Sequence, residues 1–402
     1  MHSRYVAHPT ITHGNDCMKL RTAPNDPHYT RLAALGWLHF LNDGAANFLP
    51  GILPAVLIAV GLNTGYAGAV MSALLVGQSL QFFGGWLADR IGGRWLILLG
   101  LAGSTLGAIA ISLATSPAWL IPALFGIGIS NALFHPQALA GARTLSGKRP
   151  GYGMSLFLVG GEIGRGIWPL LASLVVVAWG LRSLWWLGLP ALLSMAMLWR
   201  VIPEQPRRPA HLDGVDWSRY RLARVALVGF SLLRALAIFA TVTYLPVWWH
   251  QQGRPLVDGA SAIAVLLVVG IVGNIGGGHL ADRIGRRAVM AGSSVLGAIL
   301  FVVLLKSDGI AVWIVLGLLG MALFASLPLG ILIGQDLFPG NRSLGSGIAL
   351  GVSNGLAALA LLPLDTLARS HGVAAVFGCL AAAMLVSVIA VAALPEAIHH
   401  EQ

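Results

Sequence analysis

The sequence predicts an all-α integral membrane protein whose twelve transmembrane helices form two six-helix repeats. Composition is the first reason, because 56% of the residues are hydrophobic and only 10% are charged, whereas about a quarter of residues in soluble proteins are charged. The second is the presence of uncharged windows at 95–115, 288–305 and 372–394, each long enough to cross roughly 30 Å of hydrocarbon. The third is a six-residue sequence that occurs once in each half of the chain.

Turn signals and charged residues divide the chain into the expected spans. The first six are 31–59, 66–88, 95–115, 117–143, 151–178 and 182–202. The second six are 221–249, 257–281, 287–305, 309–335, 342–368 and 372–394. With both termini in the cytoplasm, 19 of the 25 Lys and Arg residues lie on the cytoplasmic side, as the positive-inside rule requires. The sequence therefore predicts a multi-pass protein of the bacterial inner membrane, and its net charge of +10 gives no reason to expect a nucleic-acid partner.

Polar segments set the predicted domain boundaries. A Pro- and Arg-rich stretch at 203–219 is typical of a linker and separates an N-terminal half, 30–202, from a C-terminal half, 220–395. Residues 1–29 lack the apolar core of a signal peptide. We expect them to form a disordered cytoplasmic tail, and 396–402 a second cytoplasmic tail.

An internal repeat relates the two halves. Leu-Ala-Asp-Arg-Ile-Gly occurs at 87–92 and again at 280–285. Prolines recur at almost the same separation, in the pairs Pro54 and Pro246, Pro136 and Pro328, and Pro169 and Pro363. Repeated halves are a recurring build of secondary transporters, in which the substrate site lies at the repeat interface near the midplane.

The repeated loops resemble the loop signature of the major facilitator superfamily, at the helix positions where that family carries it. The residues that match in the first loop are Gly85, Asp89, Arg90, Gly92 and Arg94. Those in the second are Gly278, Asp282, Arg283, Gly285, Arg286 and Arg287. A carboxylate at a helix end can approach the positive N-terminus of a helix in the opposite half while arginines stay among lipid headgroups. We expect a gating role; the alternative is that these charges only set topology.

A narrower resemblance covers about the first six spans. The segments 39–43 (His-Phe-Leu-Asn-Asp) and 133–137 (Leu-Phe-His-Pro-Gln), with the Gly-rich segment before Pro169, are similar to the fosmidomycin-resistance branch. This resemblance implies a central cavity and a proton-driven exporter of small compounds that works as a monomer. The sequence departs from that branch at 161–169, where Glu, Arg and Trp stand at cavity-facing positions.

Four ionisable residues fall near the middle of the predicted membrane: Asp43, Glu162, Arg165 and Arg234. Counted from the expected helix entry points, they lie about 17–21 Å deep at a rise of 1.5 Å per residue. Ionisable residues at that depth are functional candidates because each costs at least a few kcal/mol. A purely structural network of salt bridges is the alternative.

Polar neighbours accompany these charges. His39, Asp43 and Asn47 recur every fourth residue and so share one face of a helix. His135 follows Asn131 by one turn, and Glu162 and Arg165 are close enough to pair locally. We expect this set to carry proton coupling or substrate binding. Asp336 and Asp365, near span ends, are expected to meet water.

Three functions fit these residues. The leading prediction is an antiporter that exports a small molecule or drug, in which protonation of Asp43 or Glu162 competes with substrate. The second is uptake of a small anion held between Arg165 and Arg234. The remote third is an intramembrane enzyme that uses His39 and Asp43 as acid and base. Neither a metal nor another cofactor is expected, since the sequence has only two cysteines, the His residues of the tails lack metal-ligand spacing, and there is no Walker-type phosphate loop.

Overall fold

Every regular element among the described residues is a helix, which confirms the all-α prediction. The computed structural model describes residues 28–81, 83–85, 87, 94–147, 150–199, 220–338 and 342–396. The predicted linker at 203–219 lies outside them, as do most of both tails. Nine helices in the described part are long and apolar enough to cross a membrane. Twelve spans in two repeats remain a prediction.

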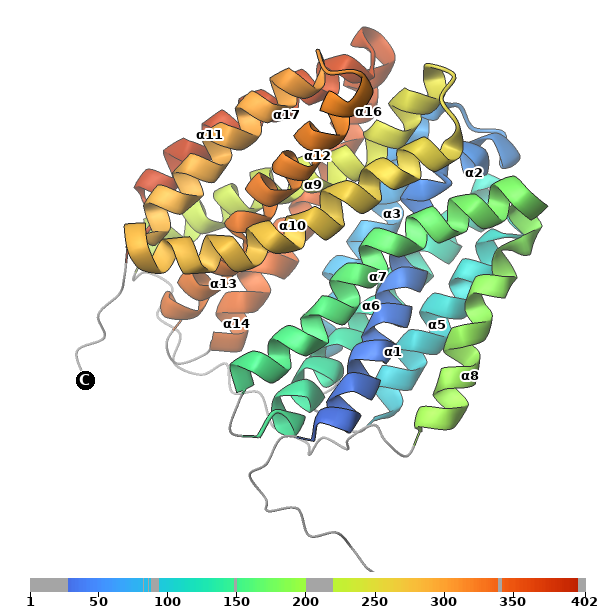
Figure 1. The fold of residues 1–402 in the computed structure, drawn as a ribbon, viewed down its shortest axis with the longest axis horizontal. Coiled ribbons are helices and arrows are strands. Elements are labelled where there is room, and N and C mark those ends of the chain that lie inside the picture. The colour runs from blue at the N-terminus through green and yellow to red at the C-terminus, as the bar shows by residue number, and fades with distance from the viewer. Residues whose placement is uncertain are drawn as a thin grey trace, which may run out of the picture.

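The helices that precede residue 200 gather on one side of the molecule (blue to green in Figure 1). They are α1 (Tyr29–Asn47), α2 (Leu53–Ala59), α3 (Ala67–Ser79), α5 (Trp95–Ile111), α6 (Pro117–Leu145), α7 (Pro150–Trp179) and α8 (Leu189–Leu198). Short 3₁₀ segments lie at Leu49–Gly51, Thr64–Tyr66 and Leu181–Gly188. The last of these occupies the start of the span expected at 182–202, so α8 is only a short helix.

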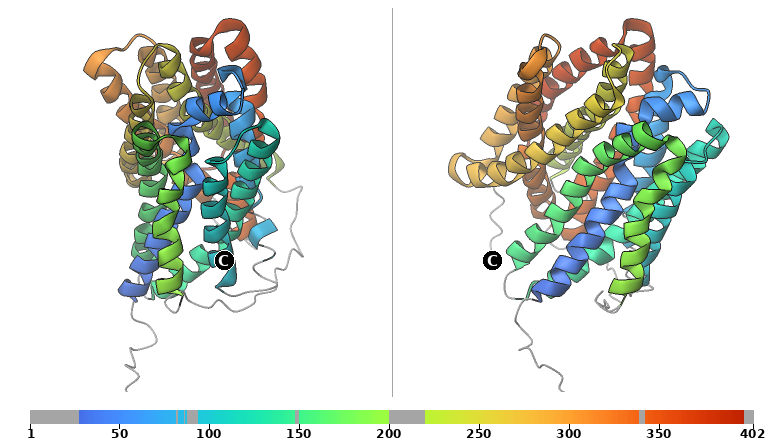
Figure 2. Two further views of the ribbon diagram at one scale, coloured as in Figure 1. Left: turned by 90° about the vertical axis from the view of Figure 1, so that its right-hand side faces the viewer. Right: turned by 45° about the vertical axis from the view of Figure 1, so that its right-hand side comes forward.

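The helices that follow residue 220 gather on the other side (yellow to red in Figure 1). The longer ones are α9 (Arg221–Gln251), α10 (Leu256–Ile284), α11 (Arg286–Leu304), α12 (Gly309–Ala325) and α17 (Val373–Ala392). The shorter ones are α13 (Leu327–Asp336), α14 (Arg342–Gly347), α15 (Ser353–Leu359) and α16 (Leu361–His371), with a π segment at Ile348–Val352. The two groups meet where α7 contacts α10 and where α3 contacts α15 and α16. Figure 2 shows this division from two further directions.

Prolines explain where the expected spans are interrupted. The helix expected at 31–59 breaks after Asn47, and Pro50 stands at the start of the 3₁₀ segment that follows. The helix expected at 309–335 breaks at Ser326, and Pro328 lies in the first turn of α13. Proline has no N–H to donate and its fixed φ suits a first turn, so it favours a new helix start. Other prolines, such as Pro136, stay inside a helix.

Glycine lets α1 and α7 approach closely. A Cβ added at Gly160 would lie 2.3 Å from the carbonyl oxygen of Gly36, so no side chain fits there. Close backbone approach at small residues is how helices associate in a membrane, where the hydrophobic effect does not drive them together. The α1–α7 contact matters because these two helices carry Asp43, Glu162 and Arg165, three of the four ionisable residues expected near the middle of the membrane.

We expect Gly160→Val to lower the thermal stability of the purified protein in detergent, because overpacking a tight contact costs about 1–3 kcal/mol. Gly126→Val is the matched control, since a Cβ at Gly126 meets nothing within 4 Å. Both substitutions place valine in a helix, so propensity effects cancel. Equal melting temperatures for the two variants, measured by intrinsic fluorescence, would contradict the close packing of α1 on α7.

Candidate functional site

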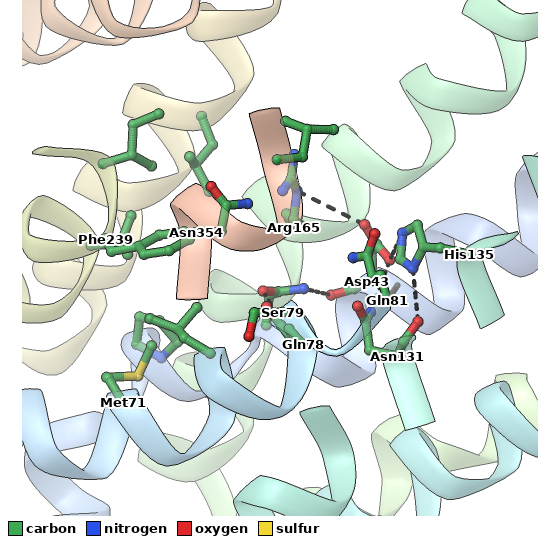
Figure 3. A pocket seen from close by; sticks show the side chains of 18 of the residues that line it. Asp43, Met71, Gln78, Ser79, Gln81, Asn131, His135, Arg165, Phe239 and Asn354 are labelled. Atoms are coloured by element: carbon green, nitrogen blue, oxygen red, sulfur yellow. Dashed lines mark hydrogen bonds and ion pairs between the residues drawn. The ribbon is translucent and has the colours of Figure 1, made fainter. Parts of the chain in front are cut away.

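A cavity of about 130 Å³ lies between the two groups of helices. A buried water needs roughly 10–15 Å³ by the same measure, so the cavity has room for on the order of ten waters or one small organic molecule. Residues from α1, α3, α6 and α7 line one wall, and residues from α9, α10, α12, α15 and the π segment at Ile348–Val352 line the other. Figure 3 shows Phe239 on one side of this space and His135 on the other.

The two walls differ in chemistry. The wall built by helices before residue 200 is rich in polar groups: Asp43, Asn47, Gln78, Ser79, Gln81, Asn131, His135 and Arg165. The wall built by helices after residue 220 is mostly apolar: Ile238, Phe239, Val242, Ile263, Leu267, Phe324 and Leu350, with Asn354 as its polar member. A molecule in the cavity therefore meets hydrogen-bonding groups on one side and hydrocarbon on the other.

Asp43 lies at the centre of the polar wall between two histidines, and we call these three residues the Asp43 cluster. Its Oδ2 lies 3.4 Å from Nε2 of His39, one turn earlier on α1, and its Oδ1 lies 3.3 Å from Nε2 of His135 on α6. The two Nε2 atoms are 3.3 Å apart. The sequence predicted the pairing of Asp43 with His39, and the fold adds His135 from a second helix.

Backbone carbonyls fix the tautomer of both histidines. Nδ1 of His39 lies 2.9 Å from the carbonyl oxygen of Phe157, and Nδ1 of His135 lies 2.9 Å from that of Asn131. A carbonyl can only accept, so each Nδ1 must donate, and in a neutral ring Nε2 is then an acceptor. Two acceptors 3.3 Å apart repel each other unless one carries a proton. The geometry is therefore satisfied when one Nε2 carries an additional proton, so that the histidine pair has one positive charge, and Asp43 supplies the balancing negative charge.

Amides and a salt bridge complete the surroundings of Asp43. The side-chain amides of Asn42 and Asn131 donate to its Oδ1 at 3.2 and 3.3 Å. Nε of Arg165 lies 3.9 Å from its Oδ2, while Nη2 of the same arginine pairs with Glu162. The predicted local pairing of Glu162 with Arg165 is thus present, and Arg165 stands between two carboxylates.

The Asp43 cluster also meets one geometric requirement of a metal site, because its three ligand atoms lie within 4.8 Å of one another. Its surroundings oppose a metal ion. Oδ1 of Asp43 already accepts hydrogen bonds from two amides, and the positive charge of Arg165 lies beside Oδ2. A second cation would meet that charge in a poorly solvated site. A proton suits the cluster better than a metal ion does.

Arg234 is a buried cation that has no counter-ion among the described residues. It lies on α9, is 4% exposed, and makes no hydrogen bond or ion pair with any residue that the structure describes. Arg234 is not one of the residues that line the cavity, but it lies one turn before Ile238, which does line it.

Comparison with known proteins places this arrangement in a family. Residues 35–361 match the profile of the Major Facilitator Superfamily. The chain belongs to this superfamily. It is 27% identical to the uncharacterized MFS-type transporter YfnC of Bacillus subtilis (strain 168) over 87% of this chain and 89% of that protein. It is 24% identical to the fosmidomycin resistance protein of Escherichia coli (strain K12) over 86% and 88%. The crystal structure of a POT family transporter in complex with 5-aminolevulinic acid superposes with a TM-score of 0.74 at 14% identity, covering 90% of this chain and 95% of that one.

The superfamily loop signature is only partly within the described residues. Asp89, Arg90 and Gly92 of the first loop lie outside them. Arg94 donates from Nη1 to the carbonyl oxygen of Trp199 at 3.2 Å and covers the Trp199 ring. Gly85 lies in a helical segment beside Pro136 of α6. The described part of this loop therefore contacts helices of its own group.

The second loop signature is described in full: its residues 278–284 form the end of α10, Gly285 is the turn, and Arg286 and Arg287 begin α11. Gly285 has φ of 92°, a conformation that favours glycine, and lets the chain turn. Nη1 of Arg286 pairs with Asp336 of α13 at 2.6 Å, and Nε of Arg287 donates to the carbonyl oxygen of Leu394. A Cβ added at Gly278 would have no other atom within 4 Å. Asp282 and Arg283 are exposed, and Asp282 makes no hydrogen bond or ion pair with a described residue in this conformation.

Asp365 is not the solvated residue that its position near a span end suggested. It is 2% exposed, and its two carboxylate oxygens accept the backbone N–H groups of Gly68 and Ala69, both at 2.7 Å. The hydroxyl of Tyr244 donates to it at 2.9 Å. Asp365 lies on α16, so it caps the first turn of α3 in the other group of helices. Asp336 also has a partner, because it pairs with Arg286.

Sequence reasoning missed several polar residues of the site. They are Asn42, which holds Asp43, and the cavity residues Gln78, Ser79, Gln81 and Asn354. A signal for some of them existed. Gln78 and Gln81 are three residues apart within an otherwise apolar span, and the amide of Gln78 reaches Asn47 of the predicted polar stripe at 3.3 Å. Polar residues without charge are easily passed over because they cost less to bury than ionised ones.

Proposed function

We propose that this major facilitator transporter is a proton-coupled exporter of a small molecule. The observation that supports it most is the Asp43 cluster, a carboxylate between two histidines on the wall of a central cavity. A group that takes and releases protons must meet the substrate space and must have partners that compensate each of its charge states. Asp43 has both.

Exchange of proton for substrate follows from competition for the same charges. Asp43 faces His39, His135 and Arg165, and Glu162 lies beyond Arg165. When Asp43 is ionised, it attracts Arg165 and the protonated histidine pair. When Asp43 takes up a proton, that attraction is lost, and Arg165 then pairs with Glu162 or with a ligand. Because proton and substrate then act on one equilibrium, each changes the affinity for the other by the same factor.

Alternating access supplies the second half of the proposal. Asp365 holds α16 against the first turn of α3, and the guanidinium of Arg369 donates to the carbonyl oxygen of Gly65 at 2.7 Å. By the expected topology these contacts lie at the outer end of the bundle. Their presence supports a conformation that is closed to the outside. The gating loops would close the inner side in the opposite conformation.

Export rather than uptake is supported by the likeness to the fosmidomycin resistance protein. We place the transporter in the bacterial inner membrane, with both termini in the cytoplasm, working as a monomer. Uptake of a small anion is the alternative, and the buried charge of Arg234 is the observation that favours it. Transport in proteoliposomes under an imposed pH gradient, with a panel of compounds that includes fosmidomycin, separates the two directions. Flux without chemical change to the compound also distinguishes a carrier from an enzyme.

We expect Asp89→Asn and Asp282→Asn to slow transport without loss of folded protein in the membrane. Loop aspartates that meet a helix N-terminus in only one conformation contribute about 0.3–1 kcal/mol to that state, so each change should alter turnover a fewfold. Asp258→Asn, in the first turn of α10 at the other end of the same helix, is the control for Asp282→Asn. Wild-type turnover in both loop variants would refute the gating role.

A further inference from the structure

We infer that the substrate is an organic anion with an apolar body, whose charged group lies between Arg165 and Arg234. This inference deepens the proposed transport function and rests on it. It names a substrate class from the charges and walls of the cavity, independently of the direction of transport and of the proton.

Arg234 carries the first part of the inference. Ionised side chains inside a membrane protein pair with one another or with backbone carbonyls, because an unpaired charge away from water is strongly disfavoured. Arg234 is buried on α9 and has no such partner among the described residues. Ile238, one turn further along α9, lines the cavity that Arg165 also lines. An anion bound between the two guanidinium groups would balance the charge of Arg234 and would also pair with Arg165.

Arg165 carries the second part. Its Nη2 pairs with Glu162 and its buried Nε faces Asp43 at 3.9 Å, whereas its Nη1 makes no hydrogen bond or ion pair with a described residue. Its side chain is 34% exposed and lines the cavity. One donor of Arg165 is therefore free for an acceptor in the cavity, and it comes from the group of helices opposite to that of Arg234. Guanidinium groups are well suited to bind a carboxylate or a phosphate.

The apolar wall defines the rest of the ligand. Phe239 and Phe324 belong to that wall, whereas Arg165 belongs to the polar one (Figure 3 shows Phe239 and Arg165). Pockets of this kind bind through apolar contact, and a few placed polar groups set the orientation. If a small anion without an apolar body were bound, the side chains of the apolar wall would remain in contact with water. The amides of Gln78 and Asn354 offer further hydrogen bonds to polar substituents.

Three small probes that share one ring separate the charge classes. Benzoate, benzyl alcohol and benzylamine are titrated into the full-length protein in detergent, and binding is measured by calorimetry without any pH gradient. We expect benzoate to bind, benzyl alcohol to bind at least about tenfold more weakly, and benzylamine not to bind, since each hydrogen bond to a charged group contributes about a tenfold to hundredfold factor. Acetate, which carries the charge without the ring, should bind more weakly than benzoate.

Substitutions of Arg234 test whether this residue binds the carboxylate of benzoate. Arg234→Gln should weaken benzoate binding roughly tenfold or more and leave benzyl alcohol unchanged, while Arg234→Lys should keep part of the affinity for benzoate. Arg221→Gln is the matched control, because Arg221 is an exposed arginine on the same helix. Benzylamine binding more tightly than benzoate to the wild-type protein would overturn the inference even if no variant folds. Unchanged benzoate affinity in Arg234→Gln would also overturn it.

The inferred substrate class and the proposed proton coupling can be refuted independently of each other. If benzoate binds as expected but a pH gradient drives no flux of it, proton coupling is wrong and the substrate class stands. If a pH gradient drives flux of a cationic compound and benzoate does not bind, the coupling stands and the inferred substrate class is wrong.

Discussion

Asp43→Asn is expected to abolish pH-driven accumulation of substrate while allowing substrate to equilibrate across the membrane. Asparagine keeps the size of aspartate and can still accept a hydrogen bond from Asn42 or Asn131, so the cavity should keep its shape. It cannot take up or release a proton. Coupling between two ligands of a protein is typically about 5- to 150-fold in affinity, and this factor should fall to about one in the variant.

Substrate flux into proteoliposomes measures this effect, with and without an imposed pH gradient. Glu162→Gln is the informative companion, because Glu162 is a half-buried carboxylate that also pairs with Arg165. His39→Ala should shift the pH profile of transport more mildly than Asp43→Asn, since His135 remains beside the carboxylate. Full pH-driven transport in Asp43→Asn, with its loss in Glu162→Gln, would move the proton site from α1 to α7.

Asp365→Asn is expected to open the outer side of the transporter. The carboxylate accepts two backbone N–H groups of α3 across the boundary between the groups of helices, and the hydroxyl of Tyr244 within its own group. An asparagine side chain can accept on one atom only, and its NH₂ group would face the second N–H. Hydrogen bonds to a charged group contribute about 1.5–3 kcal/mol, so loss of one should shift the equilibrium toward the outward-open state roughly tenfold or more.

Labelling of a cavity residue from outside reports that shift. Met71 lines the cavity from α3, and Met71→Cys in a background with Cys17→Ser and Cys379→Ser provides one reactive thiol. A membrane-impermeant thiol reagent added outside should modify it faster when Asp365→Asn is also present. Asp308→Asn is the control, because Asp308 is exposed and does not cap its helix. Equal labelling rates in all three backgrounds would show that Asp365 does not hold the outer side closed.

Local periodicity was enough to predict much of the candidate site. The four-residue spacing of His39, Asp43 and Asn47 predicted a shared face, and the structure brings all three together. The three-residue spacing of Glu162 and Arg165 predicted their pairing. Such pairs depend only on the geometry of one helix, which a sequence specifies directly. The all-helical class followed from composition for the same reason, since apolar windows without charge need no tertiary information.

Contacts between distant helices could not be predicted in this way. Asp365 was expected to meet water because it lies near the end of its span, but whether a helix end is exposed depends on what packs against it. Here α3 does, and Gly68 permits it, since a Cβ there would lie 2.7 Å from Asp365. That Arg234 has no counter-ion among the described residues could not be predicted either, because charges that balance in the sequence do not have to meet in the fold.

The central claim is that a proton moves in exchange for substrate, and proton release measured alongside substrate flux tests it most directly. Purified wild-type protein is reconstituted with a pH-sensitive dye inside the vesicles, and substrate is added outside with no initial pH gradient. An antiporter predicts that entry of substrate drives protons out, so the interior becomes more alkaline, and that Asp43→Asn abolishes this signal. Substrate entry with no change of internal pH would contradict proton coupling, and acidification of the interior would show symport instead.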